Sequence, residues 1–209
     1  MSPTKQRFLK ATAELLRKQG YSGTGLKEVA AAADAPWGSM YHFFPRGKEQ
    51  LASESILHSA EGYRKAFEVL FDRVADPIKA VKRIFEHEVE VLKASDYRDG
   101  CPLASTAVDV ASTLDPVRAA CSDGFAAWER EIDRMLRRKG LTPRESRRMA
   151  SFILSSLEGA IILSRTHRSP EPLRSAGEMT AAALEARLSA AGARSPKGRK
   201  IARNVRRAV

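Results

Sequence analysis

The chain has 209 residues, enough for one large domain or for a small domain joined to a larger one, and either arrangement can bury a substantial core. Its two cysteines and four histidines are too few and too scattered for a disulfide framework or a metal site, so we expect free thiols and no cofactor. No apolar run of membrane length occurs, and the first residues lack the pattern of a secretory signal, which predicts a cytoplasmic protein.

The positive charge is concentrated at the two ends of the chain. Residues 1–50 carry eight basic and four acidic side chains, residues 51–190 carry 21 of each, and residues 191–209 carry seven basic and no acidic side chains. Such segregation is typical of proteins that bind a polyanion, most often a nucleic acid and sometimes an anionic membrane surface. The ends of the chain are therefore the first candidates for contact with a nucleic acid.

The spacing of apolar residues predicts a helix over residues 4–19 and a shorter one over residues 26–35. In the first of these, Phe8 and Leu16 belong to one apolar stripe, and Gly20 follows as a usual helix stop. A glycine-rich turn separates the two segments, and no alternating apolar and polar pattern indicates a strand. The chain therefore begins with two helices joined by a tight connection.

A third short helix is predicted between Pro36 and Pro45. Pro36 fits the first helical position, since its missing N–H would be unpaired there, and Pro45 forces an end because the residue before a proline avoids the α region. Met40 and Phe44 are four residues apart and share the face expected to be buried. The faces that a folded core does not require carry Trp37, Gly38, Ser39, Tyr41 and His42.

Six further helices are predicted along the rest of the chain. Asp-Pro and Thr-Pro pairs repeatedly place an N-cap residue before a proline at the first helical position. The predicted segments are residues 48–72, 77–94, 103–112, 116–138, 143–168 and 171–190. Residues 191–209 carry too few apolar side chains to order themselves and predict a mobile basic tail. The pattern as a whole predicts an all-α protein.

The first three predicted helices form a helix-turn-helix, in which the last helix can enter the major groove of DNA. This part of the chain resembles the TetR family of one-component transcriptional regulators. The resemblance rests on Phe8, Ala13, Leu15, Gly20–Tyr21, Leu26–Ala30, Gly38–Phe44 and Lys48–Leu51. It implies a helix-turn-helix DNA-binding domain over residues 1–48, followed by a larger helical ligand-binding and dimerisation domain over residues 49–190.

Within that family the chain looks like the subgroup of efflux regulators named LmrA and YxaF. Three segments support this finer resemblance: residues 35–51, Gly100–Leu103 and Leu157–Ala160. The chain departs from the subgroup at Trp37, where a basic residue is frequent. A phosphate or guanine contact at that position therefore cannot be transferred to this chain.

The resemblance and the chemistry of the third helix together indicate which residues contact double-stranded DNA. Gly38 lacks a Cβ and lets the backbone approach phosphates, the Tyr41 hydroxyl can donate to a phosphate, and His42 can reach a phosphate or a base edge. Trp37 can pack on a thymine methyl or cover the edge of the small domain. The candidates are Lys27, Pro36, Trp37, Gly38, Ser39, Tyr41, His42 and Lys48.

The resemblance also implies a small-molecule inducer held among the middle helices, where aromatic side chains suit a largely apolar or aromatic ligand. The candidates for the lining of its pocket are Phe67, Phe71, Phe85, Leu103, Phe125 and Trp128. Each of them can equally be a core residue, and the sequence leaves this alternative open. Cys101 can be a redox sensor or a buried thiol, and burial is favoured because no neighbouring motif argues for a lowered thiol pKa.

A single helix-turn-helix contacts only a few base pairs, so useful specificity normally requires two copies of the protein. The segment from Ser151 to Leu163 combines small residues, which permit close approach of helices, with apolar area, and the last helix adds to it. The candidates for the dimer interface are Phe152, Ser155, Ser156, Gly159, Ile162, Leu163, Met179 and Ala183. The alternative is that these residues belong to the intramolecular core.

We therefore expect a sequence-specific, homodimeric repressor that a small apolar or aromatic ligand releases from a palindromic operator, with no membrane partner. The alternative is a non-specific or architectural DNA-binding protein that uses its basic ends. An enzyme is not indicated, because the sequence contains no nucleophile elbow, phosphate loop or set of metal ligands.

Overall fold

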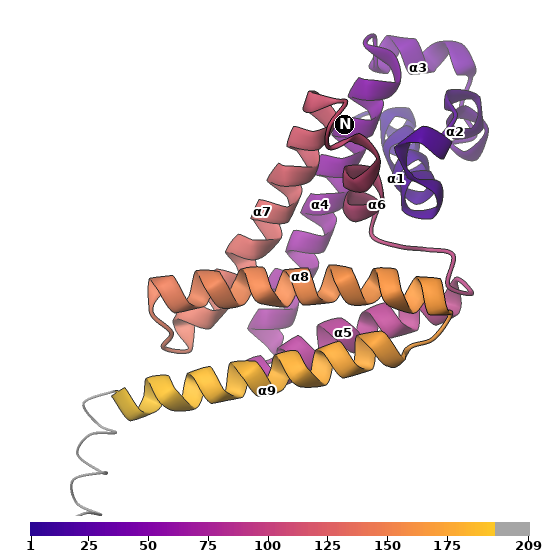
Figure 1. The fold of residues 1–209 in the computed structure, drawn as a ribbon. Coiled ribbons are helices and arrows are strands. Elements are labelled where there is room, and N and C mark those ends of the chain that lie inside the picture. Colours follow the sequence, from indigo (N-terminus) through magenta and orange to yellow (C-terminus); the bar gives the residue numbers. More distant parts are fainter. Residues whose placement is uncertain (195–209) are drawn as a thin grey trace, which may run out of the picture.

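The computed structural model describes residues 1–194, and in this range the regular structure is entirely helical (Figure 1). The helices are α1 (Pro3–Gly23), α2 (Leu26–Ala32), α3 (Trp37–Phe43), α4 (Gly47–Arg73), α5 (Pro77–Ala94), α6 (Pro102–Val110), α7 (Asp115–Arg138), α8 (Pro143–His167) and α9 (Glu171–Arg194). The predicted all-α fold is confirmed. The predicted basic tail lies outside the described residues from residue 195 on, and its first four residues belong to α9 instead.

The helix starts follow the predicted proline signals, with two corrections. The Asp76 carboxylate accepts hydrogen bonds from the backbone N–H groups of Ile78 and Lys79, and Thr142 forms a capping box at the start of α8. Pro36 is the N-cap of α3, not its first helical residue. Asp115 likewise lies inside the first turn of α7 and does not cap it.

The predicted helix stop at Gly20 is a break within α1. Gly20 has φ +71° and ψ −173°, so the helical path is interrupted there before a last turn that ends at Gly23. A Cβ at Gly20 would lie 2.9 Å from a carboxylate oxygen of Asp109, and the positive φ is one that residues with a side chain rarely adopt. The second helix ends three residues earlier than predicted because Asp34 adopts a left-handed conformation, with φ +46°, in the turn before α3.

The buried apolar residues form two separate clusters. In the smaller cluster Phe8 of α1 and Phe44 after α3 meet edge to face, with ring centroids 6.1 Å apart, next to Met40 and Val29. Leu51 near the start of α4 completes this cluster. The larger cluster is built from α4 to α9 with a contribution from α1. The helix-turn-helix unit therefore has a core of its own.

The helices of the larger part pack in pairs, as Figure 1 shows. Helix α4 packs along α7, where the Trp128 indole N–H donates to the Ala60 carbonyl oxygen at 2.9 Å. Helices α8 and α9 lie side by side at the end of the molecule away from α3, and α5 packs against α9. Within residues 1–194, no helix combines the length and the apolar character needed to cross a membrane.

Replacing Phe44 by alanine should strongly destabilise the small core. The side chain is fully buried against Phe8, so the substitution removes a ring and leaves a cavity, at a cost of about 3 to 5 kcal/mol in the free energy of unfolding. Urea denaturation followed by far-ultraviolet circular dichroism measures this change. Val108→Ala is the matched control, because Val108 is 81% exposed, and it should cost less than about 0.5 kcal/mol. Equal effects of the two substitutions would contradict the prediction.

Candidate nucleic-acid interface and ligand cleft

The two faces of α3 differ as predicted. Met40 and the following Phe44 are fully buried, which holds the helix against α1. On the opposite side Trp37 and Tyr41 are 40% and 47% exposed, and their rings meet edge to face with centroids 5.7 Å apart. His42 is exposed as well. One short helix therefore carries a buried anchor and an outward aromatic and polar surface.

The remaining residues predicted to contact DNA differ in their exposure and in their hydrogen bonds within the chain. The backbone at Gly38 faces open space, since a Cβ there would meet no other atom within 4 Å. The Ser39 hydroxyl donates to the Pro36 carbonyl oxygen at 2.6 Å, so its proton is already used inside the helix. Lys27 on α2 is exposed, whereas the Lys48 ammonium lies 4.3 Å from the centre of the Tyr21 ring and burial lowers its pKa.

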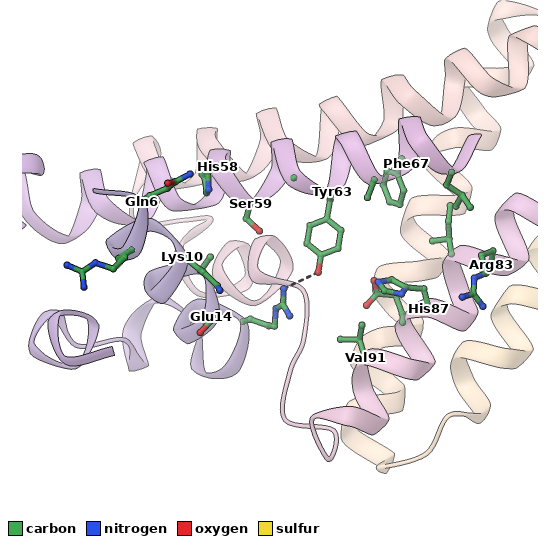
Figure 2. Close-up of a pocket in the computed structure, with 18 of the residues that line it drawn as sticks. Gln6, Lys10, Glu14, His58, Ser59, Tyr63, Phe67, Arg83, His87 and Val91 are labelled. Atoms are coloured by element: carbon green, nitrogen blue, oxygen red, sulfur yellow. Dashed lines mark hydrogen bonds between the residues drawn. The ribbon is translucent and has the colours of Figure 1, made fainter. Parts of the chain in front are cut away.

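A cleft of about 1000 Å³ lies between α1, α4 and α5 (Figure 2). Tyr63 and Phe67 project into it from α4, and His87 and Arg83 lie across from them on α5. Helix α1 supplies a third wall, which includes Lys10. The helix-turn-helix unit and the larger helical part therefore share one cavity.

Of the six residues predicted to line a ligand pocket, Phe67 alone lines this cleft. Its ring packs on Phe71 and Trp128, with centroids 6.0 and 6.1 Å away, so these two lie behind the wall of the cleft. Phe125 packs on Trp128 from the other side. The two remaining predicted residues, Phe85 and Leu103, are buried in the larger core. The structure thus separates the predicted aromatic set into one cleft residue and its supports.

The inner end of the cleft is polar, and sequence reasoning missed it. The Arg17 guanidinium donates to the Tyr63 hydroxyl at 3.1 Å and pairs with the Asp99 carboxylate at 3.5 Å. Glu88 lines the same region, and burial raises its pKa. No motif distinguishes these residues, because they come from α1, α4, α5 and the loop after α5. Only the packing of these segments brings them together.

Behind this polar end lies a second buried carboxyl group. Burial raises the pKa of Glu158 on α8 to about 7, while a hydrogen bond with the Cys101 thiol lowers it and the nearby Glu88 charge raises it further. The Glu158 Oε2 atom is buried and has no hydrogen-bond partner within the described chain. Cys101 is itself buried, and burial raises the pKa of its thiol well above the usual value.

Helix α1 is tied to the larger part by its main chain. The Gly100 N–H donates to the Arg17 carbonyl oxygen at 3.2 Å, and the Asp109 carboxylate accepts from the Ser22 N–H at 2.8 Å. The Arg165 guanidinium donates to the Lys18 carbonyl oxygen. All three hydrogen bonds involve the C-terminal part of α1, from Arg17 to Ser22.

The predicted dimer residues are distributed over α8 and α9, and one of them, Ala183, packs against the larger core, as the alternative expectation allowed. Phe152, Ile162 and Leu163 are about half exposed, and Met179 on α9 is 68% exposed. The other four predicted residues are small and lie at the surface or partly buried: Ser155, Ser156, Gly159 and Ala183. Other apolar residues of the same segment, such as Leu157, are buried in the core of the chain.

A helical unit with an exposed α3, joined to a larger helical part that shares a cleft with it, defines a two-part helix-turn-helix protein. Residues 8–54 match the family described as bacterial regulatory proteins, tetR family, and residues 77–179 match the transcriptional regulator LmrA/YxaF-like, C-terminal domain. The chain belongs to the TetR family of DNA-binding transcriptional regulators, and within it to the LmrA/YxaF-like group. Members of this family regulate transcription and are not enzymes.

Relatives and solved structures agree with this assignment. The chain is 30% identical to the HTH-type transcriptional regulator YxaF of Bacillus subtilis over 170 residues, which cover 81% of this chain and 89% of YxaF. It is 28% identical to LmrA of the same organism, over 81% of this chain and 90% of LmrA. A TetR regulator from Legionella pneumophila has the same fold, with a TM-score of 0.75 at 20% identity, over 86% of this chain and 96% of that one.

One solved neighbour contains DNA. The TetR family regulator CifR, as a cysteine mutant in complex with a 26-base-pair operator, matches with a TM-score of 0.71 at 20% identity, over 84% of this chain and 94% of that chain. At this identity the likeness concerns the fold. Groups of side chains able to hold a metal ion do not occur within residues 1–194.

Both cysteine thiols should be unreactive toward a disulfide reagent in the folded protein. Cys101 and Cys121 are buried, and burial raises the pKa of Cys121 to about 11, so about one thousandth of it is thiolate at pH 8. The measurement is the release of thionitrobenzoate at pH 8 before and after unfolding in guanidinium. Fast release from the folded protein would show that a thiol is accessible and contradict the prediction.

Proposed function

We propose that the protein is a homodimeric repressor that leaves a palindromic operator when a small, largely apolar ligand occupies the cleft between α1, α4 and α5. The observation that carries the proposal is that α1 belongs to the helix-turn-helix unit and also forms a wall of the cleft. A molecule in the cleft would therefore touch the DNA-binding unit itself.

For operator binding, α3 enters the major groove with its exposed face toward the DNA. The Tyr41 hydroxyl donates to a phosphate, His42 reaches a phosphate or a base edge, and Trp37 packs on a thymine methyl. The open space at Gly38 lets the backbone approach the sugar-phosphate chain closely. Other proposed contacts come from Lys27, Pro36, Ser39 and Lys48.

The proposed dimer interface is the apolar surface of α8 and α9. Half-exposed Phe152, Ile162 and Leu163 supply area that a partner would remove from water. Gly159 faces open space, so a helix of a second copy can approach α8 closely there. Two copies would place two α3 helices on half-sites one DNA turn apart, roughly 34 to 36 Å.

The proposed route from ligand to operator runs through Arg17. Its guanidinium is bonded to Tyr63 and Asp99, and its carbonyl oxygen accepts from Gly100. A ligand between α1 and α4 that displaces this side chain changes how α1 rests on the larger part. Because linkage is reciprocal, the ligand weakens operator binding by the same factor by which the operator weakens ligand binding.

Selection of binding sites from random DNA duplexes tests the DNA part of the proposal. We expect a palindrome bound by two copies of the chain, with the mass of the complex measured by sedimentation. Tyr41→Phe should weaken binding to that palindrome about fivefold, since one net hydrogen bond contributes about 1 kcal/mol. A protein ending at residue 194 should keep the same sequence preference. Equal binding to all sequences, lost on removing residues 195–209, would favour an architectural protein instead.

Filling the cleft covalently tests release without knowledge of the natural ligand. Ala66 is an exposed residue that lines the cleft, so Ala66→Cys accepts a bimane label there. Labelled Ala66→Cys should bind the selected palindrome at least tenfold more weakly than unlabelled Ala66→Cys, as measured by fluorescence anisotropy of the DNA.

The matched control for this labelling is Val69→Cys. Val69 lies on the same helix, is 48% exposed and does not line the cleft, so its labelling should leave operator binding unchanged. The wild-type protein, with both thiols buried, should take up no label. If fully labelled Ala66→Cys binds the operator as tightly as the unlabelled variant does, the proposal that this cleft controls release from the operator is wrong.

A further inference from the structure

Glu88 is a carboxyl group without a partner in the wall of the cleft. It projects from α5, is half-buried, and neither accepts a hydrogen bond nor forms an ion pair within residues 1–194. Taking a carboxylate out of water costs free energy unless donors or a cation compensate for the lost solvation. The Glu88 carboxyl oxygens are therefore free to accept a hydrogen bond from a molecule in the cleft.

Two basic side chains of the cleft act on Glu88 through their charge, His87 and Arg17. The Arg17 guanidinium is bonded to Asp99 and to the Tyr63 hydroxyl, and its buried Nε has no partner within the described residues. Glu158 lies behind as a further carboxyl group, with one oxygen unpartnered. The inner end of the cleft thus gathers carboxyl groups from α5, α8 and the loop after α5 near one guanidinium, and of these carboxyl groups Glu88 is the one that lines the cleft.

The walls around this polar end are apolar. Tyr63, Phe67 and Leu70 of α4 face Ile84 and Val91 of α5 across the cleft. A volume of about 1000 Å³ bounded by rings and branched side chains suits a ring-containing molecule of drug size. The polar end then fixes how such a molecule is oriented.

We propose that the cleft binds a ring-containing, largely apolar molecule whose hydrogen-bond-donating end, a hydroxyl or a protonated amine, is seated on Glu88. This inference rests on the proposed role of the cleft as the ligand site and adds the chemical class of the ligand. An acidic molecule is excluded from this orientation, because its carboxylate would face Glu88.

The basic side chains at the mouth do not reverse this preference. Arg7, Lys10, Arg83 and His87 line the cleft and are exposed. Exposed charges act through water and salt, with a screening length of about 8 Å at physiological ionic strength, whereas a partly buried carboxyl group is screened much less. The inner end therefore decides which ligand end is accepted.

Three matched probes test the inference: 2-(1-naphthyl)ethylamine, 2-(1-naphthyl)ethanol and 1-naphthylacetate, which share one ring system and differ in the end group. Titrated calorimetrically into the full chain at pH 7.5, the amine and the alcohol should bind at least tenfold more tightly than the acetate. The ratio of the dissociation constants of the amine and the alcohol shows whether the cleft prefers a charged or a neutral hydrogen-bond donor.

Glu88→Gln should reduce the preference over the acetate to less than about threefold, because the carboxyl group that accepts from the ligand donor is lost. Glu14→Gln is the matched control: Glu14 also lines the cleft but is exposed on α1, and its substitution should leave the preference intact. Thermal unfolding of both variants checks that they are folded, and Glu88→Asp, which keeps the charge, should retain the preference for a donor.

Two outcomes would overturn the inference: acetate binding as tightly as the amine and the alcohol, or an unchanged preference in Glu88→Gln. Absence of binding by all three probes at millimolar concentration would overturn it as well. A separate control tests whether the probes bind in the cleft at all. The bimane label on Ala66→Cys fills the cleft and should therefore prevent probe binding. If the probes bind labelled and unlabelled Ala66→Cys equally well, they bind outside the cleft. The proposal that the cleft is the ligand site is then wrong, whichever probe binds most tightly.

Discussion

The structure depends on one constraint: helices α1 and α4 each contribute to both hydrophobic cores. Phe8 and Leu51 lie in the core of the helix-turn-helix unit, whereas Leu16 and Ile56, farther along the same two helices, lie in the larger core. A continuous helix transmits displacement along its length because its backbone hydrogen bonds resist bending within a few turns. The position of α3 therefore cannot be independent of how the larger part is packed.

The cleft is a consequence of this arrangement. Helices α1 and α4 pack closely through their buried stripes and leave other faces open toward α5, where the cleft lies. At its inner end the chain buries Arg17 with several carboxyl groups, a costly choice when an apolar core of similar volume is often at least as stable. This polar cluster joins α1, through Arg17, to α4 and to the loop after α5.

Helix α3 shows how few residues can serve two purposes. With only seven residues it has little stability of its own, and the burial of Met40 and Phe44 holds it in place. Its opposite face is thereby free to carry exposed aromatic and polar side chains that add nothing to the core. The helix-turn-helix unit that carries this face lies within the segment that matches the tetR family of bacterial regulatory proteins.

The sequence by itself determined the helices, the helix-turn-helix, the family and the two faces of α3, because local periodicity, proline signals and a short motif carry that information. It did not determine the cleft. Phe71, Phe85 and Trp128 are as aromatic as Phe67, and an apolar side chain obeys the same pattern whether it fills a core or lines a cavity. The polar inner end, with Arg17 and Glu88, was decided only by tertiary structure, since its members lie far apart in the chain and meet through the crossing of three helices.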